Sequence, residues 1–304
     1  MTRMAADIRG CGTALVTPFH RDGSIDEPAL RRLVQRQLEG GADFLATCGA
    51  TGEEATLDEC ECDRVMAIAV EEAAGRVPVV GSVCGNDTRK MIGRVRGLDR
   101  LGIDAVLCVA PYYTIPTQEG IAEHFETLAQ HSAVPIVLYN VPGRTVVNMQ
   151  PSTIARLADH PNILGIKEAS SNLIQLTDLL LKVPPSFRVF AGYDCFAFPL
   201  LCLGAAGVIS PTANLVPAHM TRLVRLALEG RYAEARQLHA SLWWLIRAVY
   251  MEVNPLPVKA ALAMMGLIGE HYRLPLSPMK PALRARLEET LAAHGLLVTT
   301  QPHA

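Results

Sequence analysis

The sequence is poor in charged and aromatic residues, and it lacks a long uninterrupted apolar run. Only 19% of its 304 residues are charged and 5% are aromatic, with a formal charge of -2. It contains no tract of Lys and Arg, which argues against a nucleic-acid-binding protein. The longest apolar region, residues 196–211, is interrupted by Pro199, Gly204 and Gly207. It falls short of a membrane span, and we interpret it as buried core.

Signals for export and for structural metal binding are also missing. The first residues, Met1 to Asp7, lack the apolar stretch of a signal peptide. The eight cysteines are scattered, and the single residue between Cys60 and Cys62 is not the usual spacing of zinc ligands. We therefore expect a reduced, cytoplasmic protein with no structural metal.

What the sequence does contain is a regular alternation of strands and helices. Half of the residues are hydrophobic, and they recur as short apolar runs between amphipathic segments. Asp58 and Asp87 stand where helix N-caps are expected. Helices are predicted at segments such as 26–39, 58–74, 87–101 and 118–131. The predicted strands are 12–18, 42–48, 77–84, 105–110, 135–140, 163–169, 188–192 and 207–210.

This alternation predicts the α/β class, with a parallel sheet covered by helices. Eight units close a (β/α)8 TIM barrel, to which we assign residues 1–230 as the catalytic domain. The alternative is an open doubly wound sheet, which usually has a Gly-rich phosphate-binding turn after its first strand. Here the first strand ends in Thr17-Pro18-Phe19-His20, without that turn. The barrel is therefore favoured.

After residue 230 the strand pattern stops, and residues 231–304 are predicted to form a small C-terminal helical domain. The expected helices are 232–252, 256–267 and 281–294. Trp243 and Trp244 lie in the first of them, and we interpret both as helix packing rather than as a cofactor site.

A single lysine near the end of an apolar run is the strongest chemical signal. Lys167 follows Ile163-Leu164-Gly165-Ile166. Burial of an ammonium is costly, and desolvation lowers the lysine pKa, which turns an inert cation into an amine nucleophile. The alternative is a lysine whose stem covers apolar neighbours while its ammonium reaches water.

The ends of the other predicted strands carry side chains that suit the same chemistry. Barrel active sites lie where the strands end. Tyr139, Arg144 and the Gly49-to-Glu53 turn all fall at such ends. An amine, phenolic hydroxyls and backbone donors for a carboxylate together indicate carbonyl chemistry through an iminium. Taken singly, Tyr139 fits a strand-end aromatic and Arg144 fits a surface ion pair.

On these motifs the chain resembles the class I pyruvate aldolase superfamily of dihydrodipicolinate synthase and N-acetylneuraminate lyase. The likeness covers nearly the whole chain, and Gly143-Arg144-Thr145 is most like dihydrodipicolinate synthase. The resemblance implies a lyase that condenses pyruvate with L-aspartate 4-semialdehyde to 4-hydroxy-tetrahydrodipicolinate, in lysine and diaminopimelate biosynthesis. No metal or organic cofactor is implied, because the lysine iminium is the electron sink. The motifs are Gly12–Phe19, Tyr139–Pro142, Gly165–Ala169 and Asn254–Lys259.

The resemblance also implies roles for the catalytic residues. Lys167 would form the Schiff base with pyruvate, and Tyr139 would move protons to and from the carbinolamine. Tyr113 would reach across a subunit interface into the neighbour's active site. The chain would therefore assemble at least as a dimer, and the family suggests a homotetramer made of two dimers.

Substrate-binding roles follow in the same way. Thr51, with the backbone of the Gly49-to-Thr51 turn that includes Ala50, would bind the pyruvate carboxylate. Arg144 would bind the carboxylate of the aldehyde substrate, which a guanidinium fork matches geometrically. Gly192 and Ile209 would line the site through their backbone groups.

At residue 50 the chain departs from the family pattern. Relatives usually carry a hydroxyl residue there, which joins two tyrosines in a proton relay, whereas the alanine side chain neither donates nor accepts. A water could take the place of the hydroxyl. Alternatively, the chain is a related pyruvate-dependent aldolase or dehydratase that acts on a 2-keto-3-deoxy sugar acid or a similar acceptor, or it is a non-catalytic metabolite-binding relative.

A second departure concerns feedback by lysine. Family members inhibited by lysine carry polar and acidic side chains at an interface site. Asn86 is kept here, but Lys90 stands where an acid would hold the ammonium of the effector. Like charges repel, so we predict weak or absent inhibition by lysine.

Overall fold

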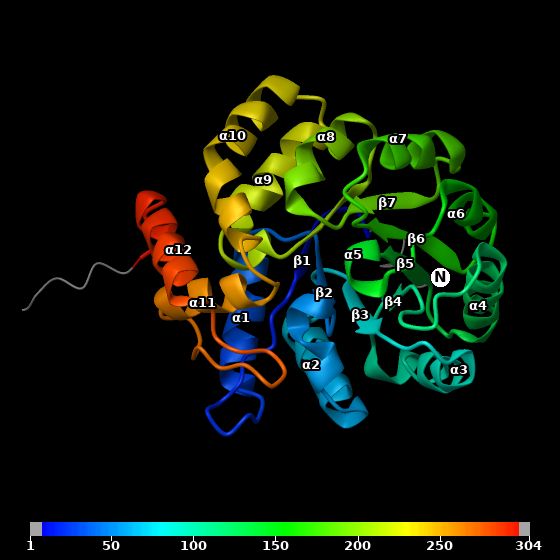
Figure 1. The fold of residues 1–304 in the computed structure, drawn as a ribbon, viewed down its shortest axis with the longest axis horizontal. Coiled ribbons are helices and arrows are strands. Elements are labelled where there is room, and N and C mark those ends of the chain that lie inside the picture. The colour runs from blue at the N-terminus through cyan, green and yellow to red at the C-terminus, as the bar shows by residue number, and fades with distance from the viewer. Residues whose placement is uncertain (1–7, 298–304) are drawn as a thin grey trace, which may run out of the picture.

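Eight short parallel strands form a closed barrel in the computed structural model, which describes residues 8–297 (Figure 1). Residues Met1 to Asp7, where no signal peptide is expected, lie outside the described residues. Each strand pairs with the next along the chain, and β8 pairs back with β1. The TIM-barrel prediction is confirmed. The strands are β1 (Gly10–Ala14), β2 (Phe44–Thr47), β3 (Val79–Val83), β4 (Ala105–Val109), β5 (Ile136–Asn140), β6 (Ile163–Glu168), β7 (Arg188–Ala191) and β8 (Gly207–Ser210).

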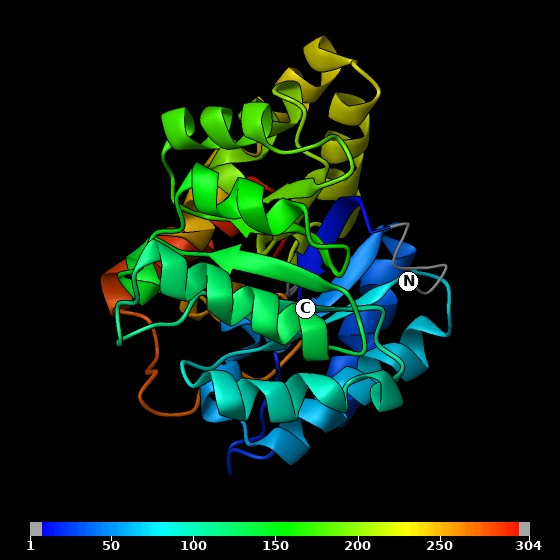
Figure 2. The ribbon, with the colours of Figure 1, turned by 90° about the vertical axis from the view of Figure 1, so that its right-hand side faces the viewer.

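The barrel helices lie outside the strands, as Figures 1 and 2 show. Asp58 caps α2 with a reciprocal capping box, and the Asp87 carboxylate accepts from the Arg89 amide at the start of α3. The helices are α1 (Glu27–Glu39), α2 (Glu59–Ala73), α3 (Thr88–Arg96), α4 (Gln118–His131), α5 (Pro142–Thr145), α6 (Pro151–Ala158), α7 (Leu173–Lys182), α8 (Ala197–Cys202) and α9 (Pro217–Leu228).

In the chain up to residue 297, three helices follow the barrel: α10 (Tyr232–Val249), α11 (Leu256–Met264) and α12 (Pro281–Ala293). α11 and α12 lie at the side of the barrel near α1 and α10 (Figure 1). Their apolar side chains share one core with the barrel, in which Leu245 and Leu287 pack in the same cluster as Val208. A domain boundary after residue 230 remains a prediction.

Side chains fill the interior of the barrel, so it is a packed core rather than a channel. Phe44 and Phe190 meet edge to face there, with ring centroids 5.5 Å apart. Neighbouring backbones approach closely where the chain has glycine. A Cβ on Gly165 would lie 2.1 Å from the Arg188 carbonyl oxygen, and one on Gly207 would lie 2.0 Å from the Gly10 carbonyl oxygen. With the interior occupied, space for a ligand remains at the strand ends.

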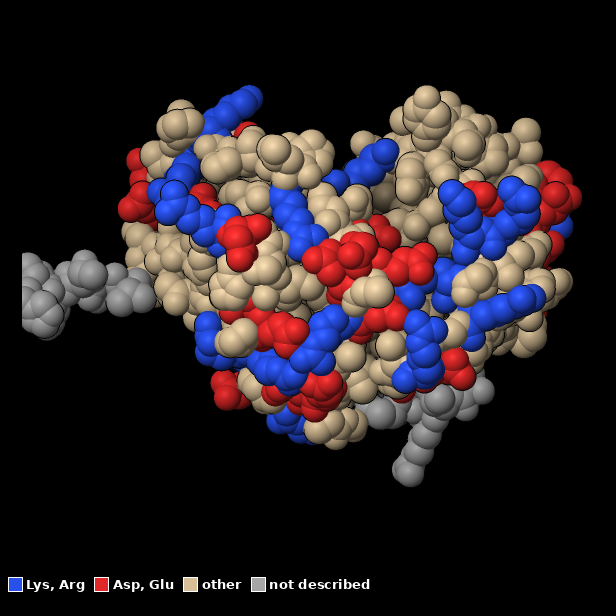
Figure 3. Space-filling model, turned by 90° about the horizontal axis from the view of Figure 1, so that it is seen from below, with Lys and Arg blue, Asp and Glu red and all other residues tan. Residues whose placement is uncertain are grey.

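Charged side chains of both signs are interspersed on the face seen in Figure 3. Many of them pair, as Arg64 does with Glu27 and Arg156 with Glu119. Within residues 8–297, no helix is both long and apolar enough to cross a membrane.

Candidate active site

Lys167 lies at the C-terminal end of β6, next to Tyr139 at the corresponding position of β5. Its side chain is buried, with 5% of its surface exposed. The ammonium nitrogen Nζ stands 4.5 Å from the centroid of the Tyr139 ring. The predicted lysine and tyrosine are thus in contact at one point of the strand-end face, and Lys167 does not reach bulk water.

Burial changes the acid–base behaviour of both groups. Desolvation lowers the pKa of Lys167 to about 8, an effect that the nearby charge of Asp194 opposes and that of Arg144 reinforces. Desolvation also raises the pKa of the Tyr139 phenol to about 12. Near neutral pH the lysine therefore loses its proton far more readily than usual, while the phenol keeps its own.

A cavity of about 170 Å³ opens over Lys167. Thr51, Tyr139, Arg144 and Gly192 all line it, which brings together most of the predicted site residues. A Cβ on Gly192 would lie 3.0 Å from Cγ of Lys167. Glycine therefore keeps the space beside the lysine stem open.

Asn254, just before α11, forms hydrogen bonds with two of the substrate-binding candidates that line the cavity. The Arg144 guanidinium donates to the Asn254 carbonyl oxygen at 2.7 Å. The Asn254 side-chain amide donates to the Thr51 hydroxyl oxygen at 2.9 Å. Because that hydroxyl accepts from Asn254, its proton is free to be donated to a ligand oxygen. The C-terminal segment thus completes the site.

A second cavity, of about 310 Å³, shares Tyr139, Arg144 and Asn254 with the first. Gly49 and Ala50 line it from the turn after β2, and Tyr112 lines it from the loop after β4. The neighbouring Tyr113 lines neither cavity and is 88% exposed at the rim. Within one chain, the structure therefore does not bring Tyr113 to Lys167.

The expected role of Ile209, which is to line the site through its backbone groups, remains a prediction. Its side chain is buried in the barrel interior, in the same cluster as Phe190 and Leu164, and it lines neither strand-end cavity. The wall on that side is made instead by Pro211, two residues later, together with Tyr193 and Tyr250.

The buried carboxylate of Asp194 acts on Lys167 through its charge. Ser210 and the Thr212 amide both donate to Oδ2 of Asp194, each at 3.0 Å. The Asp194 amide in turn donates to the Tyr250 hydroxyl at 3.1 Å. Burial raises the pKa of Asp194, and the positive charge of Lys167 opposes that rise. These hydrogen bonds hold the Asp194 carboxylate in one position, from which its negative charge acts on Lys167.

The turn that carries Thr51 is held by a buried ion pair. Glu53 adopts a left-handed backbone conformation with φ 57°, which is uncommon for a residue with a side chain. Its carboxylate accepts from Nζ of Lys259 in α11 at 2.5 Å, and both side chains are fully buried. Nζ of Lys259 also stands 4.2 Å from the centroid of the Phe19 ring. The pair therefore joins the turn after β2 to the C-terminal helices.

Sequence reasoning identified the motif that contains Asn254 and Lys259 but not the contacts that these two residues make. Tyr250 was missed altogether. Their partners lie far away in sequence, as with Asn254 and Thr51, whose sequence separation is 203. No local spacing could have indicated them.

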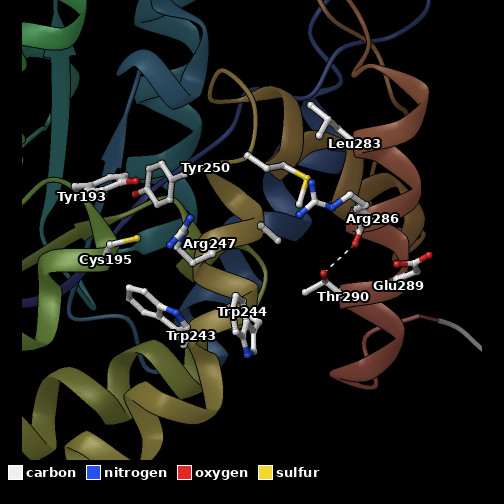
Figure 4. Close-up of a pocket in the computed structure, with 12 residues that line it drawn as sticks. Tyr193, Cys195, Trp243, Trp244, Arg247, Tyr250, Leu283, Arg286, Glu289 and Thr290 are labelled. Carbon is white, nitrogen blue, oxygen red and sulfur yellow. Dashed lines mark hydrogen bonds between the residues drawn. The ribbon is translucent and has the colours of Figure 1, made fainter.

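A larger cavity, of about 600 Å³, lies behind the wall formed by Tyr193 and Tyr250 (Figure 4). These two rings meet edge to face with centroids 4.2 Å apart, and they line both this cavity and the one over Lys167. Trp243 and Trp244 line it from α10. Trp244 is 68% exposed, so the expectation that it packs in a helix interface is wrong.

Comparison with known proteins places this geometry in one family. The model of the dihydrodipicolinate synthetase family matches residues 7–294. The 4-hydroxy-tetrahydrodipicolinate synthase of Acidobacterium capsulatum is 48% identical, over 97% of this chain and 98% of the relative. Two solved structures each have a TM-score of 0.94. One is a chloride-inhibited dihydrodipicolinate synthase from Acinetobacter baumannii complexed with pyruvate, at 37% identity over 95% of this chain and 100% of that chain. The other is a monomeric dihydrodipicolinate synthase variant, which is 39% identical over 96% of this chain and 99% of that chain.

Proposed function

This chain belongs to the dihydrodipicolinate synthetase family, and from that membership we propose how it acts. It condenses pyruvate with L-aspartate 4-semialdehyde to 4-hydroxy-tetrahydrodipicolinate, as a class I pyruvate-dependent lyase. The observation that carries its mechanism is the buried Lys167 amine, in contact with the Tyr139 ring in a cavity that Arg144 and Thr51 also line.

Lys167 supplies the nucleophile. With a pKa of about 8, roughly one amine in ten is neutral at pH 7, against about one in three thousand at the ordinary value of 10.5. The neutral amine adds to the ketone carbon of pyruvate to give a carbinolamine. Loss of water then gives an iminium, and loss of a methyl proton gives the enamine that attacks the aldehyde.

Tyr139 supplies the proton for the loss of water. Its phenol stays protonated because burial holds its pKa at about 12, and it lies beside the lysine nitrogen on which the carbinolamine forms. The phenol donates to the departing hydroxyl and recovers a proton afterwards, so it acts first as an acid and then as a base.

Thr51 and Arg144 hold the two substrate carboxylates. The Thr51 hydroxyl, which accepts from Asn254, donates to pyruvate at the floor of the cavity. The Arg144 guanidinium keeps further N–H donors beside the one that bonds Asn254, and these suit the carboxylate of the semialdehyde. A short acceptor with a carboxylate fits this arrangement better than a long polyol does.

A homo-oligomer, as a dimer of dimers, is the assembly we infer. Tyr113 is exposed at the rim of the strand-end face, where a second subunit could bury it. Leu173 and Ile174 on α7 and Leu203 after α8 also leave apolar side chains exposed. Sedimentation of the purified protein tests this proposal: a single species of monomer mass at micromolar concentration would contradict it.

Steady-state turnover with pyruvate and L-aspartate 4-semialdehyde, coupled to the reductase that consumes the product, tests the proposed reaction. We expect turnover of about 1 to 10³ per second. Negligible turnover with the semialdehyde, together with cleavage of a 2-keto-3-deoxy sugar acid, would contradict the synthase assignment and favour a different pyruvate aldolase.

A further inference from the structure

The cavity behind the Tyr193–Tyr250 wall has an unusual balance of charge. Arg247 on α10 and Arg286 on α12 both line it, and neither has a carboxylate oxygen within 4.0 Å among residues 8–297. Other arginines of the chain, such as Arg64, Arg156 and Arg284, form ion pairs. Glu289 is the acidic residue in the lining, and Figure 4 shows its side chain pointing away from the two arginines. The cavity therefore carries uncompensated positive charge.

Flat aromatic surfaces lie beside these charges. The Arg247 guanidinium stands 5.7 Å from the Trp243 ring centroid, and the Trp244 ring is largely exposed. Tyr193 and Tyr250 also line this cavity, as the wall that it shares with the cavity over Lys167. Guanidinium groups bind carboxylates through paired hydrogen bonds, and exposed aromatic rings favour a planar apolar ligand face.

We propose that this cavity binds a small planar carboxylate anion, with Arg247 and Arg286 holding the carboxylates and the tryptophans packing against the ring. Its volume of about 600 Å³ is within the range of small-molecule sites. The two arginines would also attract the phosphate of a phosphorylated ligand, but the two adjacent tryptophans favour a ligand with a flat ring.

Tryptophan fluorescence tests this proposal directly, because Trp243 and Trp244 are the only two tryptophans in the chain. The full-length protein is titrated with pyridine-2,6-dicarboxylate at constant ionic strength. We expect a saturable change in emission, and each of Arg247→Gln and Arg286→Gln should raise the apparent Kd about 10-fold or more, because a charge-assisted hydrogen bond is lost.

Two controls locate the binding. Arg236 is an exposed residue on the same helix that does not line the cavity, so Arg236→Gln should leave the Kd unchanged. Arg144→Gln, at the catalytic cavity, should also leave it unchanged. A linear, non-saturable response in the wild type would overturn the proposal, as would a Kd that is insensitive to both cavity substitutions.

A separate observation concerns the proton path from Tyr139. Ser82 on β3 is 2% exposed, and its hydroxyl has no hydrogen-bond partner within the structure of residues 8–297. It lines the same cavity as Ala50 and Tyr139. It also borders the glycine turn, since a Cβ on Gly49 would lie 3.4 Å from the Ser82 hydroxyl oxygen. A buried hydroxyl without a protein partner can still donate to, and accept from, a group or a water in the cavity that it lines.

We infer that Ser82 supplies the hydroxyl that Ala50 lacks, and this inference rests on the proposed Schiff-base mechanism. When Tyr139 gives its proton to the carbinolamine hydroxyl, which leaves as water, the phenolate must recover a proton. Ser82 donates one, directly or through one water, and regains it from solvent in the cavity. Both hydroxyl groups are then neutral again, and the positive charge resides on the Lys167 iminium until a methyl proton is lost.

Exchange of the pyruvate methyl protons in D2O tests this step without the second substrate. We expect Ser82→Ala to slow exchange by about 10²-fold, within the usual contribution of acid–base assistance. The Ala50→Thr change should restore exchange in the Ser82→Ala protein to within a few-fold of the wild-type rate. A merely structural role for Ser82 would not give this rescue.

The outcomes separate this inference from the reaction itself. If the Ser82→Ala protein exchanges at the wild-type rate, Ser82 has no part in the relay. The same conclusion follows if Ser82→Ala slows exchange by the same factor whether residue 50 is Ala or Thr. Absence of exchange in the wild type would instead refute enamine formation, and with it the proposed function.

Discussion

At the level of single residues, the proposed catalysis depends on Lys167, whose ammonium form is destabilised by burial. A pKa lowered to about 8 predicts that the rate of Schiff-base formation rises with pH up to about 8 and then levels off. The sign follows because only the neutral amine attacks, and raising the pH removes its proton. The measurement is the initial rate of borohydride-trapped adduct formation at saturating pyruvate. A rate that keeps rising past pH 10 would show an ordinary, solvated lysine.

Arg144 gives a second prediction at this scale. Arg144→Lys keeps the charge but loses the guanidinium fork, which donates to Asn254 and to the proposed substrate carboxylate. We expect kcat/KM for the semialdehyde to fall about 10- to 100-fold, the usual effect of a lost charge-assisted hydrogen bond. The amount of pyruvate adduct on Lys167 should not change. Equal losses in adduct and in turnover would place Arg144 at the pyruvate subsite instead.

At the scale of elements, the buried Lys259–Glu53 pair connects the turn after β2 to α11. Lys259→Met removes the partner of a fully buried carboxylate, which typically costs about 3–5 kcal/mol of the free energy of unfolding. The double substitution Glu53→Gln with Lys259→Met removes both charges, and we expect it to recover much of the loss. Urea unfolding followed by circular dichroism measures both. A Lys259→Met protein within 1 kcal/mol of wild type would contradict this role.

The elements also show how far sequence reasoning reaches. All eight strands were predicted from their apolar runs, because strands buried on both faces carry few polar residues. The first strand is nevertheless β1, Gly10–Ala14, and not 12–18. Its pairing with β2 and β8 decides those ends, and a local pattern does not contain that information. In the same way, Lys167 was identified from its own strand, whereas the contact of Asn254 with Thr51 depends on how distant segments meet.

At the level of the whole molecule, we predict that this chain differs from lysine-inhibited relatives in its response to lysine. Asn86 and Lys90 line a cavity of about 290 Å³ that also contains Glu54. Glu59, Asp87 and Arg94 also line this cavity, and the ammonium of a lysine effector placed beside Lys90 would meet a like charge. We expect no inhibition at sub-millimolar lysine, and Lys90→Glu should make the enzyme more sensitive. Half-inhibition of the wild type at sub-millimolar lysine would contradict the prediction.

The proposed mechanism requires that Lys167 forms a covalent imine with pyruvate, and trapping of that imine with borohydride is the decisive experiment. Intact-mass and peptide analysis after reduction with pyruvate should show one adduct per chain, located on Lys167. Without pyruvate, and in Lys167→Ala with pyruvate, the adduct should be absent. An unmodified Lys167, or an adduct that persists in Lys167→Ala, would contradict the account, whatever turnover the protein shows.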